Sequence, residues 1–348
     1  MKRLKRILGM RGLLGWFTAG ILSLAIASLF VLVYNYSGTH ITNPSEATDY
    51  KWMPAQYKAV WGEGINYMRM DDNGFNNLSS DTDGIDLLLM GGSHMEAVQF
   101  GTKYNAGSCL NNLLDLKTYN VGMSGHQLVN CLDNLEAAVA AYRPSAYVVI
   151  QTSSLDVTMD EVKAVHDGTL ADIPSYDSGI VYQLQKIPAL KVIYKQLSDK
   201  LAIDRAGVAA GKAEDAIAAE GYDEDAGRME KLQVMAEVLE EKAALCADNG
   251  IRLVLAYTPG VSVDSAGTIY RNDNEEWAGT VEKAAADAGI IMVDCYEAFK
   301  DEYENSCALP FGFHNAAMGS GHLNKTGHRI VAQEIAEAVK DTAGEVPE

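Results

Sequence analysis

Five short apolar segments, separated by helix-compatible stretches, constrain the fold of this chain more than any other feature. They cover residues 86–90, 118–121, 146–150, 252–257 and 290–294. Short apolar runs of this kind suit strands that are buried on both faces of a parallel sheet. We therefore predict an α/β domain with a doubly wound, flavodoxin-like sheet of five parallel strands and helices on both faces.

The stretches between these segments carry apolar residues at helical spacing. Residues 127–142 place Leu128, Leu132, Leu135 and Val139 on one face. The other expected helices are residues 106–116, 229–248, 275–288 and a last one through Ile330 and Val339. Residues 157–228 interrupt the alternation of strands and helices, and they contain helix-like stretches around 182–201 and 213–227. We expect them to form a helical insertion over the sheet.

The amino-terminal segment predicts membrane insertion. No charge lies between Gly12 and Thr39, and the 24 residues of 13–36 would span about 36 Å as a helix, enough to cross a bilayer. Basic residues precede this segment and acids follow it, which favours a cytoplasmic amino terminus. A cleaved signal peptide is the alternative, because Ala25-Ile-Ala27 resembles a cleavage site. The apolar run continues to Tyr34 and favours an uncleaved anchor; in either case residues 40–348 are exported.

Three regions follow from these patterns. Residues 1–39 form a cytoplasmic basic tail and transmembrane anchor. Residues 40–80 form a juxtamembrane linker with irregular or β structure that packs on the main domain. Residues 81–343 form the α/β domain, with the insertion at about 157–228.

Charge and motifs exclude several functions. The net charge is −19, and the first 39 residues hold five bases and no acid, so residues 40–348 carry −24. A domain this acidic repels nucleic acid and anionic lipid surfaces. The sequence lacks GxGxxG and GxxxxGK[ST], and its five cysteines show no metal-binding spacing. We predict no nucleic-acid partner, no metal and no organic cofactor.

Candidate catalytic residues follow the first and last predicted strands. Ser93 comes after Gly91-Gly92 at the carboxyl end of the first strand, where open α/β sheets place their ligands. Ser93 could instead cap the next helix, with Glu96 completing a capping box. Residues 313–328 read as a loop rich in Gly, Ser and Asn that carries His314, His322 and His328. Loops after parallel strands open on the same sheet edge, so a loop His can meet Ser93.

The order of these blocks resembles the SGNH (GDSL-type) hydrolases over residues 84–340. Gly91-Gly-Ser93 is similar to the Gly-Asp-Ser block of that family, Asn120-Val-Gly-Met-Ser-Gly125 to its second block, and Gly321-His-Leu-Asn-Lys-Thr-Gly327 to its His block. The resemblance implies that Ser93 is the nucleophile, that the backbone N–H groups of Ser93 and Gly125 hold the oxyanion, and that His322 is the general base.

Two departures from the family pattern concern the oxyanion donor and the acid. The third block lacks its Asn, and Thr152, Ser153 or Ser154 could supply a hydroxyl instead. The Asp that normally stands three residues before the His is replaced by Gly319. We expect Asp156 to orient His322, ahead of Asp294, with a Ser–His dyad as the remaining alternative.

The function that these patterns predict is enzymatic. We expect a membrane-anchored, extracytoplasmic serine esterase or deacylase that acts on acyl esters of a cell-surface or extracellular glycan, or on an acylated small molecule. The departures also resemble divergent, membrane-anchored family members that modify extracellular polysaccharides. An O-acyltransferase of exopolysaccharide and a non-catalytic glycan-binding surface protein are the alternatives.

Overall fold

The α/β domain is built on a five-stranded parallel sheet, as predicted. The computed structural model describes residues 2–34, 40–42, 48, 50–170, 187, 189, 190, 193 and 224–343. The strands are β5 (Leu87–Gly91), β6 (Thr118–Asn120), β7 (Tyr147–Thr152), β8 (Arg252–Tyr257) and β11 (Ile291–Asp294). Their spatial order is β11-β8-β7-β5-β6, all parallel. This is the flavodoxin-like order. The chain adds β6 on one side of β5 and then adds β7, β8 and β11 on the other side, so the order of addition reverses between β5 and β7.

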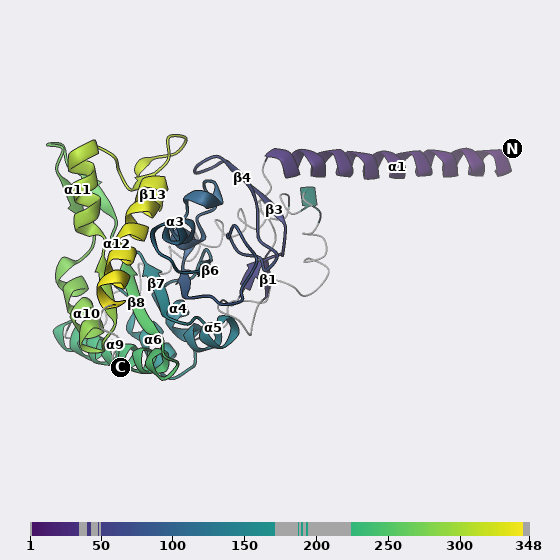
Figure 1. Ribbon diagram of the computed structural model, residues 1–348. Coiled ribbons are helices and arrows are strands. Elements are labelled where there is room, and N and C mark those ends of the chain that lie inside the picture. The colour runs from purple at the N-terminus through teal and green to yellow at the C-terminus, as the bar shows by residue number, and fades with distance from the viewer. Residues whose placement is uncertain are drawn as a thin grey trace. The chain divides into compact units, whose positions relative to one another are not determined.

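Alternate residues of each strand enter two separate cores, because successive side chains of a strand point to opposite faces. Leu88 and Met90 of β5 lie in one core, and Leu87 and Leu89 in the other; all four are 0–1% exposed. Burial of one such side chain contributes roughly 1.5–3 kcal/mol. The continuous apolar runs in the sequence therefore correspond to strands that are covered on both faces (Figure 1).

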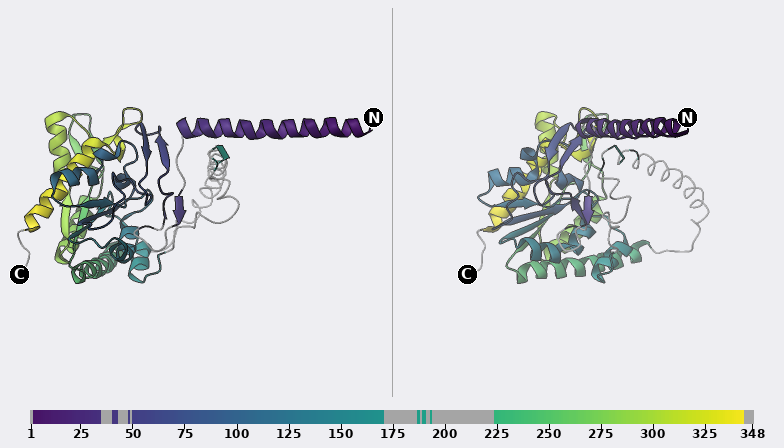
Figure 2. Two further views of the ribbon diagram at one scale, coloured as in Figure 1. Left: turned by 45° about the vertical axis from the view of Figure 1, so that its right-hand side comes forward. Right: turned by 90° about the vertical axis from the view of Figure 1, so that its right-hand side faces the viewer.

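Helices cover both faces of the sheet (Figures 1 and 2). The core that contains Leu88 is closed by α4 (Leu128–Asp133), α5 (Leu135–Tyr142), α6 (Met159–His166), α9 (Glu224–Asp248) and α10 (Glu275–Asp287). The core that contains Leu87 is closed by α3 (Ala106–Leu113), α11 (Tyr296–Ser306) and α12 (Lys325–Ala343). The short helices α2 (Ser93–Glu96) and η1 (Thr102–Tyr104) connect β5 to α3.

Short antiparallel pairs flank the parallel sheet. Residues 40–80 contain two of them, β1 (His40–Thr42) with β2 (Tyr50–Trp52) and β3 (Tyr57–Val60) with β4 (Asn66–Arg69). The pair β9 (Val261–Val263) and β10 (Ile269–Arg271) follows β8.

The segment predicted as a loop between the fifth strand and the last helix is a β-hairpin, so that prediction was wrong. Strand β12 (Phe311–Gly312) pairs with β13 (Met318–Leu323), with a register shift between Phe311 and Gly312. Glycines at positive φ make this irregular pairing possible, with Gly319 at φ +82° and Gly321 at φ +83°. His322 therefore projects from a strand.

The amino-terminal helix α1 (Lys2–Tyr34) belongs to a separate unit from the α/β domain. It contains an apolar span, Gly12–Val31, that is long enough to cross a membrane. Such a helix is either a signal sequence or an anchor. Of the predicted insertion at 157–228, the structure describes α6 and the start of α9, whereas the helix-like stretch 182–201 and most of 213–227 lie outside the described residues.

Candidate active site

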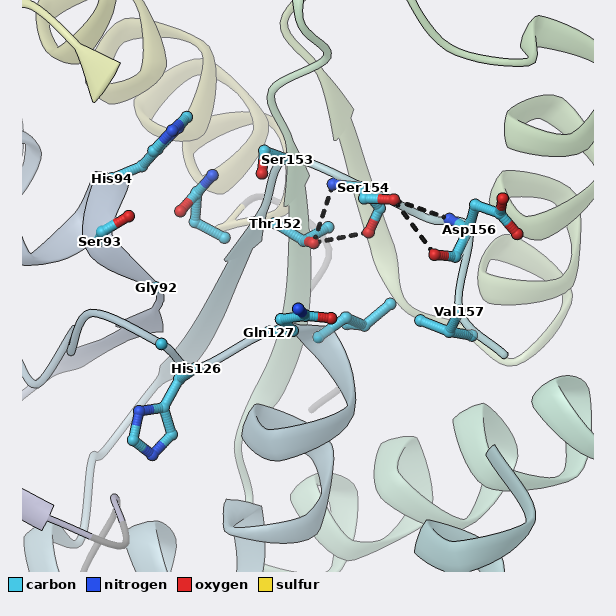
Figure 3. Close-up of a pocket in the computed structure, with 13 residues that line it drawn as sticks. Gly92, Ser93, His94, His126, Gln127, Thr152, Ser153, Ser154, Asp156 and Val157 are labelled. Atoms are coloured by element: carbon cyan, nitrogen blue, oxygen red, sulfur yellow. Dashed lines mark hydrogen bonds between the residues drawn. The ribbon is translucent and has the colours of Figure 1, made fainter. Parts of the chain in front are cut away.

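A cavity of about 450 Å³ opens at the carboxyl edge of the sheet, where the strand order reverses (Figure 3). Three segments line it: 92–94 after β5, 125–128 after β6, and 151–157 at and after the end of β7, the last without Leu155. Of the candidate site residues named from the sequence, the cavity is lined by Ser93, Gly125, Thr152, Ser153, Ser154 and Asp156, whereas His322 and Asp294 do not line it. Ligand sites of doubly wound sheets lie at this topological position.

Ser93 is the first residue of α2, and Gly92 is the residue that caps this helix. The alternative in which Ser93 caps the helix is therefore wrong, and the side chain of Glu96 is bound elsewhere. The backbone N–H groups of a first helical turn have no partner within the helix, so the Ser93 N–H is free of the α2 ladder. In Figure 3 the Ser93 hydroxyl points across the cavity toward residues 152–154, at and just after the end of β7, whereas the His94 side chain extends toward the top of the view.

The loop that carries Gly125 is fixed by hydrogen bonds to the buried carboxylate of Glu96. Glu96, only 1% exposed, accepts hydrogen bonds from the Ser124 hydroxyl and, at 3.2 Å, from the Ser124 N–H. The Tyr50 hydroxyl donates to the Ser124 carbonyl. Gly125 adopts φ +94°, and a Cβ atom there would lie 2.5 Å from the Tyr50 oxygen. Only glycine fits this position without displacing Tyr50.

The wall opposite Ser93 is rich in hydroxyl groups. Thr152 Oγ1 donates to the Ser154 carbonyl at 2.7 Å, and Ser154 Oγ accepts from the Asp156 N–H at 3.1 Å. These bonds fix the turn that follows β7 and leave Ser153 and Ser154 exposed to the cavity (Figure 3).

His322 lies beside this cavity, and its carboxylate partner is Glu63. The imidazole Nδ1 is 2.5 Å from Glu63 Oε2, and the backbone N–H of His322 donates to Glu63 Oε1 at 2.6 Å. Within the described chain His322 is not a lining residue of the cavity; its ring centroid is 5.5 Å from that of His94, the neighbour of Ser93. Strand β13 packs against α2, so Ser93 and His322 both lie near the carboxyl edge of the parallel sheet.

The expectation that Asp156 orients His322 was wrong. The Asp156 carboxylate is exposed and lies 2.9 Å from Lys231 Nζ. Asp294 is engaged as well, because it accepts from the Tyr296 N–H at 2.8 Å and from Arg271 Nη1 at 3.0 Å. The prediction for Asp156 was wrong because the turn after β7 directs the Asp156 side chain toward Lys231 of α9 and not toward His322.

The carboxylate that pairs with His322 comes from the β3–β4 turn and was not predicted from the sequence. Glu63 and His322 are 259 positions apart, and Trp61-Gly-Glu-Gly64 has no spacing that points to a histidine. Gly319, in place of the Asp of the family pattern, was the one signal in the sequence that a carboxylate from elsewhere could pair with His322.

Two further histidines lie near the site and are held neutral. Burial, with a smaller effect from His322, lowers the pKa of His94 to about 4, and its buried Nδ1 has no hydrogen-bond partner within the described chain. Burial also lowers the pKa of His328 to about 3. His328 Nδ1 accepts a 3.1 Å bond from the Ala106 N–H, which marks it as a core residue. His314 is exposed on the β12–β13 hairpin.

No group of three or more His, Cys, Asp or Glu side chains is arranged to hold a metal ion within the described residues. Cys109, Cys246, Cys295 and Cys307 are free thiols.

Comparison with known proteins gives distant structural neighbours. No protein-family model matches the chain, and no curated protein matches it. Its neighbours among solved structures are SGNH- and GDSL-like hydrolases and lipases. A GDSL-like lipase from Bacteroides thetaiotaomicron is 13% identical, with a TM-score of 0.33, over 74% of this chain and 88% of its own. The acetyl xylan esterase AlAXEase is 15% identical, with a TM-score of 0.37, over 72% and 98%. Likeness at this distance assigns no catalytic residue.

Proposed function

We propose that this chain is an extracytoplasmic serine esterase that cleaves or transfers acyl groups of a glycan. One observation carries the proposal: Ser93, Gly125, Ser153 and Ser154 line a single cavity, and His322 with its carboxylate partner lies beside the helix that Ser93 begins. Nucleophile, base and oxyanion donors within one site are the requirements of acyl transfer.

The chemistry needs only groups of this chain. Ser93 Oγ attacks the acyl carbonyl carbon and gives its proton to His322 Nε2, the nitrogen that does not face Glu63. The negative charge on the carbonyl oxygen is held by the N–H groups of Ser93 and Gly125, with Ser153 as a further hydroxyl donor. When this tetrahedral intermediate collapses, the bond to the alcohol breaks, and the departing alcohol takes the proton from His322. The acyl group then passes to water or to a sugar hydroxyl, which regenerates Ser93.

A hydroxyl-rich substrate is supported by the polar surroundings of the cavity. A second cavity of about 430 Å³ shares Ser153, Ser154 and Asp156 with the first, and Asn272 and Asn274 line its far side. Amide, hydroxyl and carboxylate groups pair well with sugar hydroxyls. Each cavity falls within the 300–1,000 Å³ typical of small-ligand sites. The acidic domain also favours a neutral or cationic glycan.

The apolar helix α1 supports a location for the proposed site outside the cell membrane. We propose that Gly12–Val31 stays in the membrane with the basic amino terminus in the cytoplasm, which places the catalytic domain outside.

The test of this function is active-site labelling of the full-length protein in detergent. A fluorophosphonate probe should label Ser93, as read by peptide mass spectrometry, and Ser93→Ala should reduce hydrolysis of a small acetyl ester to the background rate. His322→Ala should cost as much as Ser93→Ala, and the double variant little more, because nucleophile and base act as one unit.

His314→Ala is the matched control, because His314 is exposed on the same hairpin as His322. It should retain the wild-type rate. Label on another serine, or turnover by the Ser93→Ala protein, would remove Ser93 from the mechanism. A larger loss for His94→Ala than for His322→Ala would make His94 the base. Glycan binding without label or turnover would favour a non-catalytic role.

A further inference from the structure

The turn between β3 and β4 reaches the site from outside the parallel sheet. The carboxylate of Glu63 contacts His322 twice, at the ring Nδ1 (2.5 Å) and at the backbone N–H (2.6 Å). Two bonds to one carboxylate fix both the position of the strand and the rotation of the ring. The side chains of Glu63 and His322 are only 25% and 29% exposed, so water competes weakly for these bonds.

Asn315, in the turn of the β12–β13 hairpin, fixes the turn that carries Glu63. Its Nδ2 donates to the carbonyls of Trp61 (3.0 Å) and Gly64 (2.9 Å), and its Oδ1 accepts from the Gly64 N–H at 3.0 Å. The β3–β4 turn and the β12–β13 hairpin are therefore joined by two sets of hydrogen bonds. Glu63 binds the strand that carries His322, and Asn315 binds the residues on either side of Glu63.

This arrangement selects one form of the imidazole. A carboxylate accepts hydrogen bonds and cannot donate them, so it favours the form with the proton on Nδ1. The lone pair of Nε2 is then available to accept the Ser93 proton. The negative charge also stabilises the imidazolium that forms during acyl transfer.

We propose that Glu63 is the positioning residue that completes the site, and that Asn315 holds it in place. The exported segment between α1 and the sheet then supplies one part of the catalytic machinery, and the α/β domain supplies the rest. This inference rests on the proposed role of His322 as base.

The decisive variant is Glu63→Gln, which keeps the size of the side chain and removes its charge. The kcat for a small acetyl ester should fall by about 10²–10⁴-fold, with a much smaller change in KM. Glu63→Asp should recover part of this loss because it restores the charge at a longer distance. Glu302→Gln is the matched control, because Glu302 is also 25% exposed and is paired with Arg329 at 2.6 Å, but lines no part of the cavity. It should keep the wild-type kcat.

A second readout does not depend on turnover. The ¹⁵N chemical shifts of the His322 ring report which nitrogen carries the proton. They should show a proton on Nδ1 in the wild type and a mixture of forms in Glu63→Gln. Asn315→Ala should lower kcat in the wild-type background and cost little more in Glu63→Gln, because both act through the same contact.

The outcomes separate this inference from the proposed function. A wild-type kcat and wild-type ring shifts in Glu63→Gln would overturn the role of Glu63 while Ser93 labelling still supports the esterase. Absence of labelling and of Ser93-dependent turnover in the wild type would overturn the esterase, and the ring shifts would still decide whether Glu63 sets the protonation of His322. If Glu63→Gln fails to fold, the Asn315→Ala kcat and ring shifts decide.

Discussion

At the residue scale, two glycines of β13 differ in what a side chain would meet. Gly321 and Gly319 share nearly the same positive φ, +83° and +82°, so alanine is strained at both by about 1–2 kcal/mol. A Cβ atom at Gly321 would overlap Glu63 Oε1, whereas one at Gly319 would lie 3.2 Å from the end of the Leu309 side chain. Alanine substitutions at Gly319 and Gly321 therefore distinguish backbone strain alone from backbone strain combined with displacement of the Glu63 carboxylate.

We predict that Gly321→Ala lowers esterase kcat by at least tenfold, whereas Gly319→Ala loses stability but keeps most of its kcat. The reason is that the new methyl group at Gly321 pushes Glu63 away from His322. The measurement is kcat for a small acetyl ester beside the melting temperature of each variant. Equal kcat values in the two variants would show that the position of Glu63 is not limiting.

At the element scale, the β3–β4 hairpin is joined to the α/β core by a buried ion pair. Lys58 Nζ of β3 lies 3.6 Å from Glu96 Oε1 and 3.7 Å from the centre of the Trp52 ring. The Lys58 and Glu96 side chains are 10% and 1% exposed. Glu96 also holds Ser124, so this pair connects the hairpin to the loop that carries Gly125.

Lys58→Met should destabilise the protein by about 3–5 kcal/mol, because it leaves a buried carboxylate without this cation. Lys117→Met is the control: Lys117 pairs with Asp81 at the surface, with the two side chains 33% and 61% exposed. Loss of an exposed pair should cost no more than about 1 kcal/mol. Urea denaturation of both variants measures the difference, and equal midpoints would mean that the buried pair contributes little.

At the scale of the whole molecule, the chain joins an apolar helix to an acidic α/β domain. The span Gly12–Val31 is 20 residues long, about 30 Å as a helix, which matches the hydrocarbon thickness of a bilayer. A retained anchor would keep the proposed esterase at the membrane surface.

Full-length protein should sediment with membranes, resist extraction by high salt, and expose its carboxyl terminus to external protease. Ala27→Leu provides the control, because signal cleavage requires a small residue at that position. The substitution should leave the distribution unchanged if the helix is an anchor. A soluble wild-type form that begins near Ser28 and disappears in Ala27→Leu would establish a cleaved signal sequence.

Local patterns in the sequence determined the sheet and the position of Ser93. The apolar runs predicted the five parallel strands, because burial on both faces favours apolar residues at most positions of a strand. Gly91-Gly92 marked the turn after the first strand, and the order of parallel strands directed the search to their carboxyl edge. Ser93, Gly125, Ser153 and Ser154 line a cavity at that edge.

The partner of His322 was decided by the tertiary structure alone. Asp156 had the expected position along the chain, but its side chain pairs with Lys231, while Glu63 arrives from a hairpin 259 residues before His322. Hydrophobic periodicity is a local signal, since it reports which face of an element is buried. The meeting of two turns depends on how whole elements pack, and the spacing of residues within one strand or helix carries no record of that packing.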